Sequence, residues 1–343
     1  MSAHMSVDTI LSGCHGSPYS NVQQRVLGSL WAGYGQLVSV QATNVYNKQC
    51  SLVIKHFIPP RRRHDGSEDH CRKVRSYSVE SWFYRGISSR MRERGVLVPE
   101  LKGVLEEDGV MIVMSDLCEH GTYYTKRGNQ LNLEEGKALL SWLAKFHAVH
   151  WRTRDPPQGL WDEGSFWQLG TRREELDDME EVWVRRGLNR KTAEDIHEAI
   201  VKSRFRTVIH GDAKAANFFF YPAGQHDGSL LIGGYDFQYS GMATPLRDVA
   251  YVMCCSIKGD LVEACEDELL SHYYTELTRA LRPDDADEYS MEELEVMYEL
   301  CVVDLARFMS GSRWWGNTEY IENKASRWLA QPTLAACCNS SVS

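Results

Sequence analysis

The chain has 343 residues, of which 43% are hydrophobic and 25% are charged, and it carries a net charge of −9. This length allows one two-lobed unit or two ordinary domains. The acidic balance disfavours bulk nucleic-acid binding, which requires a basic face. The sequence contains no apolar run of the roughly 18 residues that a membrane span needs, and its first residues do not resemble a signal peptide. We therefore expect a cytoplasmic protein that binds neither nucleic acid nor membrane.

Cysteine and histidine spacing gives no strong metal-binding pattern. The ten cysteines include no Cys-x-x-Cys pair, and adjacent residues such as Cys254 and Cys255 are poorly placed to chelate one ion. We expect free cytosolic thiols that are mostly buried. His147 and His150 lie three residues apart in a helical pattern, and we interpret them as core or capping residues rather than metal ligands.

The N-terminal third predicts a small antiparallel sheet. Residues 24–57 contain three apolar segments separated by turn signals, and the middle segment, 36–41, alternates apolar and polar residues nearly at period two. Gly33 and Gly35 lie in the first turn. Their backbone N–H groups could approach phosphates closely, but a plain hairpin turn explains the two glycines equally well.

A polar stretch separates these strands from the first predicted helix. We expect residues 59–77 to form a loop in which the arginine run Arg61–Arg63 is solvated rather than bound to a polyanion. A helical pattern follows over residues 78–87. Two more strands come next, and Asp116 lies at the end of the second, 110–117.

The rest of the chain is mainly helical in pattern. Helices are predicted over three segments, which are 133–150, 192–203 and 292–309. Residues 154–190 are irregular and contain Trp161, Trp167 and Trp183, which either form a substrate wall or fill the core. We expect the tail from Gln331 to be disordered.

The most informative stretch follows a short apolar strand. It reads His210-Gly-Asp212-Ala-Lys214-Ala-Ala-Asn217, and Asp236 comes 19 residues after Asn217. Phosphoryl transfer needs one carboxylate that orients the attacking hydroxyl, and oxygen ligands that hold Mg²⁺ on the phosphates. In this spacing Asp212 suits the first task, and Asn217 with Asp236 suits the second.

This pattern resembles that of the small-molecule kinases with a protein-kinase-like fold. They include the aminoglycoside phosphotransferases, the choline kinases and the ecdysteroid-kinase-like proteins. His210-Gly-Asp212 with Asn217 is similar to their catalytic loop. Asp236-Phe-Gln238, in place of Asp-Phe-Gly, resembles the choline- and ecdysteroid-kinase-like (CHK) branch.

The resemblance implies an α+β, two-lobed protein-kinase-like fold. The small antiparallel-sheet lobe would comprise residues 21–117 and the larger, mainly helical lobe residues 118–330, with tails at 1–20 and 331–343. The resemblance also implies that the protein uses ATP and Mg²⁺. The acceptor of the γ-phosphate would be a hydroxyl group on a small molecule.

In this superfamily a strand lysine, paired with a helix glutamate, positions the nucleotide phosphates. The resemblance assigns these roles to Lys55 and Glu80, with Glu93 as the alternative acid. Taken alone, Lys55 would be interpreted as a snorkelling surface lysine. Asp116 would lie near the nucleotide at the interlobe hinge, or would cap that hinge structurally. The turn at Gly33–Gly35 would cover the phosphates.

The residues of the catalytic loop have separate implied roles. Asp212 would accept a hydrogen bond from the attacking hydroxyl and take its proton late in the transfer. Lys214 would neutralise charge on the γ-phosphate, His210 would orient the loop, and Asp248 would hold the loop backbone.

The acceptor site is the least specific part of the pattern. Asp304, Trp314 and Trp315 are candidates for an anionic and aromatic wall that would bind an ammonium group. The alternative is a salt bridge between Asp304 and Arg307, three residues apart on one helix face. Choline, ethanolamine, a sterol, an aminoglycoside or another hydroxylated metabolite all remain open as acceptors, as does the oligomeric state.

Two other functions compete with a small-molecule kinase. A catalytically silent nucleotide-binding or scaffold protein is disfavoured by the complete polar set, namely Lys55, Asp212, Asn217 and Asp236. A protein kinase would need a peptide-docking segment after Asp236, and the sequence shows no Ala-Pro-Glu motif there. We therefore predict an ATP-dependent phosphotransferase.

Overall fold

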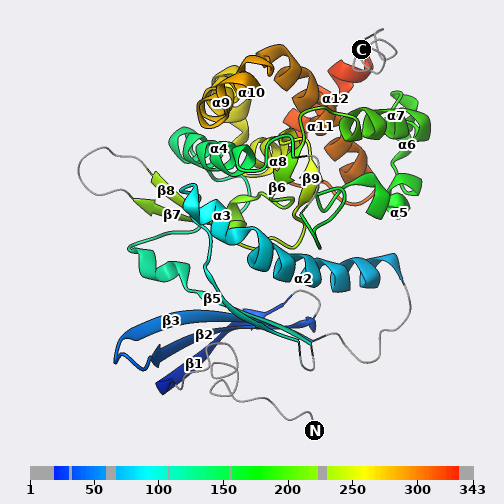
Figure 1. Cartoon of the computed structure of the whole chain (residues 1–343). Helices are drawn as coiled ribbons and strands as arrows, with labels where there is room; N and C mark the ends of the chain where they lie inside the picture. Colours follow the sequence, from blue (N-terminus) through cyan, green and yellow to red (C-terminus); the bar gives the residue numbers. More distant parts are fainter. Residues whose placement is uncertain are drawn as a thin grey trace.

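The computed structural model describes residues 19–30, 33–58, 67–106, 109–153, 157–222 and 230–331 (Figure 1). The run Arg61–Arg63 and most of the two predicted tails lie outside these residues. Within them, an N-terminal five-stranded antiparallel sheet is followed by a mainly helical part. This architecture confirms the predicted mixed fold, with its small sheet lobe and its larger helical lobe.

The sheet of the N-terminal lobe has the strand order β1-β2-β3-β5-β4. Its strands are β1 (Ser20–Ser29), β2 (Gly35–Thr43), β3 (Gln49–Phe57), β4 (Leu101–Leu105) and β5 (Val110–Ser115). Successive side chains of a strand point to opposite faces. Leu52 and Ile54 of β3 pack with Val40 in an apolar cluster. Val53 and Lys55 belong to the opposite face of β3 and line the cleft between the lobes. The alternation of β3 therefore places Lys55 in that cleft.

Helix α2 (Glu68–Gly86) begins ten residues before the predicted helix, so the prediction of a polar loop is wrong for residues 68–77. The Ser67 side chain caps the helix by accepting a hydrogen bond from the backbone N–H of His70. The first turns are polar, and apolar periodicity therefore did not reveal them. The cap and the acidic first turn were the available signal. Figure 1 shows α2 lying between the sheet and the helical lobe.

The helical lobe follows β5 through a turn of 3-10 helix, η2 (Leu117–His120). The remaining helices are α3 (Ser88–Glu93), α4 (Leu133–Ala148), η3 (Leu169–Thr171), α5 (Arg173–Asp177), α6 (Glu181–Arg185), α7 (Arg190–Val201), η4 (Ala215–Asn217), α8 (Leu246–Cys255), α9 (Gly259–Ala280), α10 (Pro283–Asp287), α11 (Met291–Ser310) and α12 (Thr318–Leu329). Helices α4, α7 and α11 match the three predicted ones to within two residues at each end. The stretch predicted as irregular contains the short helices η3, α5 and α6.

Two short antiparallel strand pairs lie within the helical lobe. They are β6 (Thr207–Ile209) with β9 (Gly241–Ala243), and β7 (Phe218–Pro222) with β8 (Leu230–Gly234). Strand β6 leads directly into the loop that begins at His210, and β8 leads to Asp236. These two pairs therefore bring the polar motif residues to one edge of the lobe.

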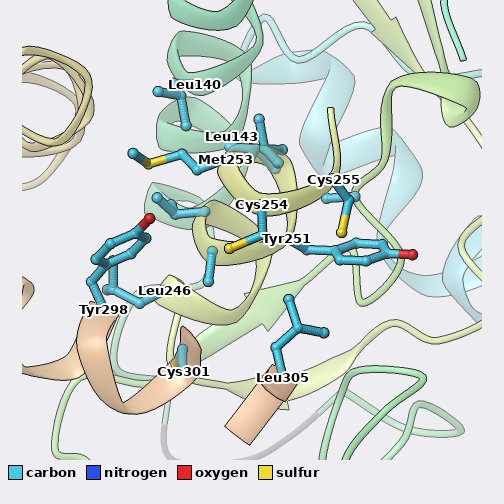
Figure 2. Close-up of a cluster of buried hydrophobic side chains, with 14 of the residues drawn as sticks. Leu140, Leu143, Leu246, Tyr251, Met253, Cys254, Cys255, Tyr298, Cys301 and Leu305 are labelled. Carbon is cyan, nitrogen blue, oxygen red and sulfur yellow. The ribbon is translucent and has the colours of Figure 1, made fainter. Parts of the chain in front are cut away.

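Helix α8 is buried along its whole length. Figure 2 shows Met253 and Cys254 of α8 among Leu140 and Leu143 of α4, with Leu305 of α11 nearby. Apolar packing on this scale leaves α8 little freedom to move. The helix therefore gives a fixed support to any polar side chain that it carries.

None of the seven described cysteines forms a disulfide. Three are buried, three are partly buried and Cys71 is exposed, so fewer are buried than predicted. Burial raises the pKa of the Cys254, Cys255 and Cys301 thiols, which keeps them protonated and unreactive. Among the described residues, His, Cys, Asp and Glu side chains form no group of three that could hold a metal ion. None of the described helices combines the length and the apolar character of a membrane span.

Stacked aromatic rings join the two lobes. Phe83 of α2 lies nearly parallel to Phe237, with ring centroids 3.8 Å apart, and Phe237 lies 6.0 Å from Phe146 of α4. The His210 ring lies 4.8 Å from Phe237. All four side chains are completely buried. Because Phe237 directly follows Asp236, this column fixes the backbone of Asp236 between α2 and the helical lobe.

Candidate active site

The loop after β6 is held by one buried carboxylate. Asp248 of α8 accepts hydrogen bonds from the backbone N–H groups of His210, at 2.6 Å, and Gly211, at 2.9 Å. The Nε2 atom of His147 lies 3.2 Å from the same carboxylate, and its Nδ1 atom lies 2.8 Å from the hydroxyl of Tyr273. Two backbone donors fix the loop more strictly than one could. The contacts match the supporting role that the sequence predicts for Asp248.

His210 is oriented by hydrogen bonds from both of its ring nitrogens. Its Nδ1 atom lies 3.3 Å from the backbone nitrogen of Asp212 and accepts that N–H. Its Nε2 atom lies 3.0 Å from the carbonyl oxygen of Tyr235, to which it donates. Burial lowers the pKa of the ring, so the imidazole is neutral at physiological pH. His210 therefore shapes the loop and is poorly suited to carry a proton during catalysis.

Asp212 has one oxygen engaged and one oxygen free. Its Oδ2 atom accepts hydrogen bonds from Nζ of Lys214, at 2.8 Å, and Nδ2 of Asn217, at 3.0 Å. Its Oδ1 atom is buried and has no hydrogen-bond partner among the described residues. Burial raises the pKa of Asp212, while the charge of Lys214 limits the rise. Asp212 lines the cleft, so the free oxygen can accept a hydrogen bond from a ligand there.

The ammonium group of Lys55 lies between two carboxylates. Its Nζ atom is 2.6 Å from Oε2 of Glu80 and 2.7 Å from Oδ1 of Asp236. The structure thus brings together the pair predicted from the sequence, and no described ion pair links Lys55 to Glu93. Burial opposes the charge on Lys55, but the two carboxylates outweigh it and raise the pKa of the ammonium group. Lys55 is therefore charged at any physiological pH.

Asp236 adopts an unusual backbone conformation that its neighbours support. Its φ angle is +69°, in the left-handed region that few residues other than glycine occupy. The side-chain amide of Gln238 donates to Oδ1 of Asp236 at 2.8 Å, and Oε1 of Gln238 accepts from the hydroxyl of Ser76 in α2 at 3.1 Å. Burial opposes ionisation of Asp236, yet Lys55 holds its pKa below the usual value. The sequence pointed to Gln238 only as a departure from glycine and did not reveal this contact.

Asn217 and Asp236 offer oxygen atoms of the kind that Mg²⁺ prefers. Both hydrogen bonds of the Asn217 side chain use its amide nitrogen, which donates to the backbone oxygen and to Oδ2 of Asp212. The amide oxygen of Asn217 therefore has no partner among the described side chains. One or two protein oxygens, completed by phosphate oxygens and water, are a typical Mg²⁺ environment. The residues present fit such an ion.

A cavity of about 830 Å³ lies between the lobes, and of the residues described above it is lined by Lys55, Glu80, Asp212, Lys214, Asp236 and Gln238. The wall on the side of the sheet includes Leu37 of β2, Val53 of β3 and Met114 of β5. Asp116 also lines it, but its carboxylate is occupied: it accepts from the backbone N–H of Cys118 at 2.9 Å and from the hydroxyl of Ser51 at 2.9 Å. Asp116 is thus a cap at the hinge, which is one of its two predicted roles.

Gly33 and Gly35 form a hairpin turn beside this cavity. Both have positive φ angles, +77° and +138°. A Cβ atom on Gly35 would lie 1.9 Å from the backbone oxygen of His56, so only glycine fits at that position. Neither glycine is among the residues that line the cavity. The conformation of the turn is therefore explained by strand pairing alone.

The helical lobe supplies an aromatic and basic wall to the same cavity. The wall comprises Phe166, Arg172, Tyr239, Tyr251, Arg313 and Trp315. The guanidinium group of Arg172 is fixed by hydrogen bonds to the backbone oxygen of Phe166, at 2.7 Å, and to Glu175, at 3.0 Å. Sequence reasoning predicted only Trp315 of this set. The others come from four separate segments without a common motif.

The structure separates Asp304 from this wall and corrects the hypothesis of an anionic acceptor pocket. Its carboxylate is buried 2.8 Å from Nε of Arg307 and 3.6 Å from Nη2 of Arg247. It does not line the cavity. Trp314 instead lies beside Trp183, with ring centroids 5.5 Å apart and the rings tilted by 33°. The salt bridge, which was the alternative interpretation of Asp304, is what the structure contains.

The three tryptophans of the segment 154–190 fill the core. Trp161, Trp167 and Trp183 are 6%, 0% and 1% exposed, and none of them lines the cavity. Trp161 also donates its indole N–H to the backbone oxygen of Gln238 at 2.9 Å. Of the two roles considered for these side chains, the structure therefore favours packing over a substrate wall.

Comparison with known proteins identifies the family. Two similar solved structures are a candidate fructosamine-3-kinase from Thermobifida fusca, at 14% identity and a TM-score of 0.47 over 94% of this chain and 97% of that one, and an ethanolamine kinase from Plasmodium vivax, at 9% identity and a TM-score of 0.45 over 96% and 86%. No curated protein matches the chain. The model of the ecdysteroid kinase-like family matches residues 37–160 and 165–283, which is more than half of the chain. The protein therefore belongs to the ecdysteroid kinase-like family.

Proposed function

We propose that the protein is a kinase that transfers the γ-phosphate of ATP to a hydroxyl group on a small molecule. The observation that carries the proposal is the position of Asp212. Its unpaired oxygen is buried at the cavity between the lobes, which is also lined by Lys55 and Asp236. A carboxylate next to a cation-stabilised phosphate site is the arrangement that phosphoryl transfer needs. Membership of the family supports this reaction class.

The nucleotide would lie against the sheet, with its phosphates at Lys55. Glu80 fixes the Lys55 side chain by an ion pair of 2.6 Å, so the ammonium group does not need to be ordered when the nucleotide binds. The apolar residues Leu37, Val53 and Met114 provide a surface suited to the adenine ring. The cytoplasm supplies ATP and keeps the free cysteines reduced, and we place the reaction there.

Asn217 and Asp236 would hold Mg²⁺. An ion held by these residues would neutralise negative charge on the phosphate groups. Asp236 is prepared for this task because Gln238 and Lys55 already fix its Oδ1 atom. Its side chain is 30% exposed, which leaves it accessible from the cavity.

Asp212 would orient the acceptor and receive its proton. The free Oδ1 atom accepts a hydrogen bond from the attacking hydroxyl, while Lys214 and Asn217 keep the carboxylate fixed through Oδ2. The raised pKa of Asp212 makes the carboxylate a better proton acceptor than an exposed aspartate. Lys214 is 40% exposed, so its ammonium group can also turn toward a transferring phosphate.

The composition of the acceptor wall bears on the choice of acceptor. Arg172 and Arg313 add positive charge to this side of the cavity, and Asp304 is absent from it. A cationic acceptor would meet this charge without the predicted anionic partner. The aromatic rings of Phe166, Tyr251 and Trp315 instead favour a hydroxylated acceptor with an apolar body.

The two competing functions are less well supported. Nine residues, 237–245, separate Asp236 from the start of α8 at Leu246, and β9 takes up three of them. That leaves no room for a peptide-docking segment of the kind a protein kinase uses. A silent nucleotide-binding protein has no need of the free oxygen of Asp212, whose burial without a partner costs stability.

The substitution Asp212→Asn tests the proposed reaction directly. We expect it to lower kcat by at least about 10²-fold, because the amide cannot take the proton of the acceptor, while ATP affinity stays nearly unchanged. The measurement is ATP turnover against a panel that includes a sterol, choline and an aminoglycoside. Asp162→Asn, at a side chain that is 92% exposed, is the matched control. Equal turnover of both variants would show that Asp212 is not the base.

The substitution Asp236→Asn tests the metal site. It preserves the size of the side chain but removes the charge that Mg²⁺ needs, so the stimulation of ATP binding by Mg²⁺ should be lost. Titration of a non-hydrolysable ATP analogue with and without Mg²⁺ measures this effect. Glu80→Gln removes an equal charge from the other side of Lys55 and should keep the Mg²⁺ dependence. If Asp236→Asn keeps it as well, the ion is held elsewhere.

A double-mutant cycle on Lys55→Ala and Glu80→Ala tests the role of the ion pair. Each substitution should raise the KM for ATP or lower kcat, with Lys55→Ala the more severe. Because the two side chains are in contact, their effects on transition-state stability should differ from additivity by about 0.5–3 kcal/mol. Strict additivity would mean that Glu80 does not act through Lys55.

The pH dependence of Lys214→Ala tests the environment of Asp212. Burial raises the pKa of Asp212 and Lys214 counteracts this rise, so removal of Lys214 should raise the pKa further. The acid limb of the kcat/KM profile should therefore move to higher pH. Lys214→Arg keeps the charge and should leave the limb nearly in place. An unmoved limb in Lys214→Ala would show that another group controls it.

A further inference from the structure

A second cavity of about 680 Å³ lies outside the interlobe cleft. It forms where α3 meets the C-terminal ends of α4 and α9. Its wall carries six cationic side chains, which are Arg90, Arg94, Lys145, Arg152, Arg279 and Arg282. Two acidic residues, Glu276 and Asp285, also line it. None of these residues belongs to the site proposed for phosphoryl transfer.

The local charge remains positive after the two lining acids and Glu288 are counted. Glu288, which pairs with Arg152 from outside the wall, removes one further positive charge. The C-terminal ends of α4 and α9 each act as roughly half a negative charge. About two positive charges remain, in a chain whose net charge is −9. The pocket is thus an exception to the overall charge of the protein.

Three of the six cations have acidic partners and three do not. Arg152, Arg279 and Arg282 pair with Asp285, Glu276 or Glu288. Arg90, Arg94 and Lys145 form no ion pair with any residue in the described part of the chain. Their charges are therefore available to a ligand. Arg90 and Arg94 lie in α3 and at its C-terminal end, whereas Lys145 lies in α4. The three side chains can therefore contact an anion from two sides.

His150, which lines the same cavity, carries an unsatisfied polar atom. It is 9% exposed, and its Nε2 atom is buried without a hydrogen-bond partner among the residues that the structure describes. Burial and the nearby charge of Arg90 lower the pKa of the ring to about 4, so the imidazole is neutral at physiological pH. A neutral ring can donate one N–H. An acceptor oxygen from a ligand would remove the cost of leaving this atom unpaired.

We propose that this cavity binds a small organic molecule through its phosphate group. A phosphate group offers several acceptor oxygens and up to two negative charges, which match the free cations and the N–H of His150. Arginine and lysine are the side chains that most often bind such groups. The volume is that of a ligand larger than phosphate alone, so the remainder of the molecule occupies the space beside Trp151 and Leu281.

The test uses the full chain and two probes, inorganic phosphate and glycerol 3-phosphate, titrated at constant ionic strength maintained with potassium chloride. Binding is measured by calorimetry and by the NMR shift of the His150 ring. Arg90→Glu and Lys145→Glu should each weaken binding at least about tenfold, the loss expected for one charge-assisted hydrogen bond. Both side chains are exposed, so neither substitution should impair folding.

Arg92→Glu is the matched control, because it makes the same charge change in α3 at a residue that lines a different surface and pairs with Glu100 at 3.4 Å. Lys55→Ala removes the interlobe phosphate site and should leave this binding unchanged. The proposal is overturned if Arg90→Glu binds as tightly as Arg92→Glu, or if Lys55→Ala abolishes binding. It is also overturned if glycerol 3-phosphate binds more weakly than inorganic phosphate, because the cavity would then exclude the organic part. Binding of the ester that is equal or tighter supports it.

Discussion

The active site depends on a single buried ammonium group held between two carboxylates. Lys55 comes from β3, Glu80 from α2 and Asp236 from the end of the β7–β8 hairpin, so the ion triad links three parts of the chain. Two negative charges face one positive charge, and burial raises the pKa of Glu80 to about 7. Positive charge added beside Asp236 would favour the ionised form of Glu80 and thereby its tight pairing with Lys55.

A second constraint fixes the other half of the site. Asp248 holds the backbone at His210 and Gly211, and it is itself held by His147 and by the apolar packing of α8. The orientation of Asp212 thus depends on α8, which is buried in the hydrophobic core along its whole length, rather than on contacts at the surface. The aromatic column through Phe237 performs the same task for Asp236. Precise placement of polar atoms in this protein is a consequence of apolar packing behind them.

Local signals in the sequence sufficed for the strands and for the motif residues. The alternation of β3 determines which face Lys55 occupies, and the spacing around Asp212 is itself a chemical signature. Contacts between distant segments were not accessible in this way. Gln238 acts through Ser76, more than 160 residues away, and Asp304 is occupied by Arg247 from another helix. The start of α2 was missed because the side chains that its first turns bury, such as Arg72, Lys73 and Ser76, are polar, and hydrophobic periodicity cannot detect them.

The basic cavity could not be predicted from local sequence signals either. It is built partly from elements that also support the candidate active site. Its cations lie far apart in the sequence, and only folding turns them into one positive region of an acidic protein. Helix α4 contacts Asp248 through His147, and it lines the basic cavity with Lys145, while His150 follows just after the helix ends at Ala148. Arg90 belongs to α3, which continues directly from α2 and hence from Glu80. An anion bound there would contact both α3, which follows the helix that carries Glu80, and α4, which carries His147. It would therefore favour the relative position of the two lobes in which Lys55 and Asp212 are both oriented.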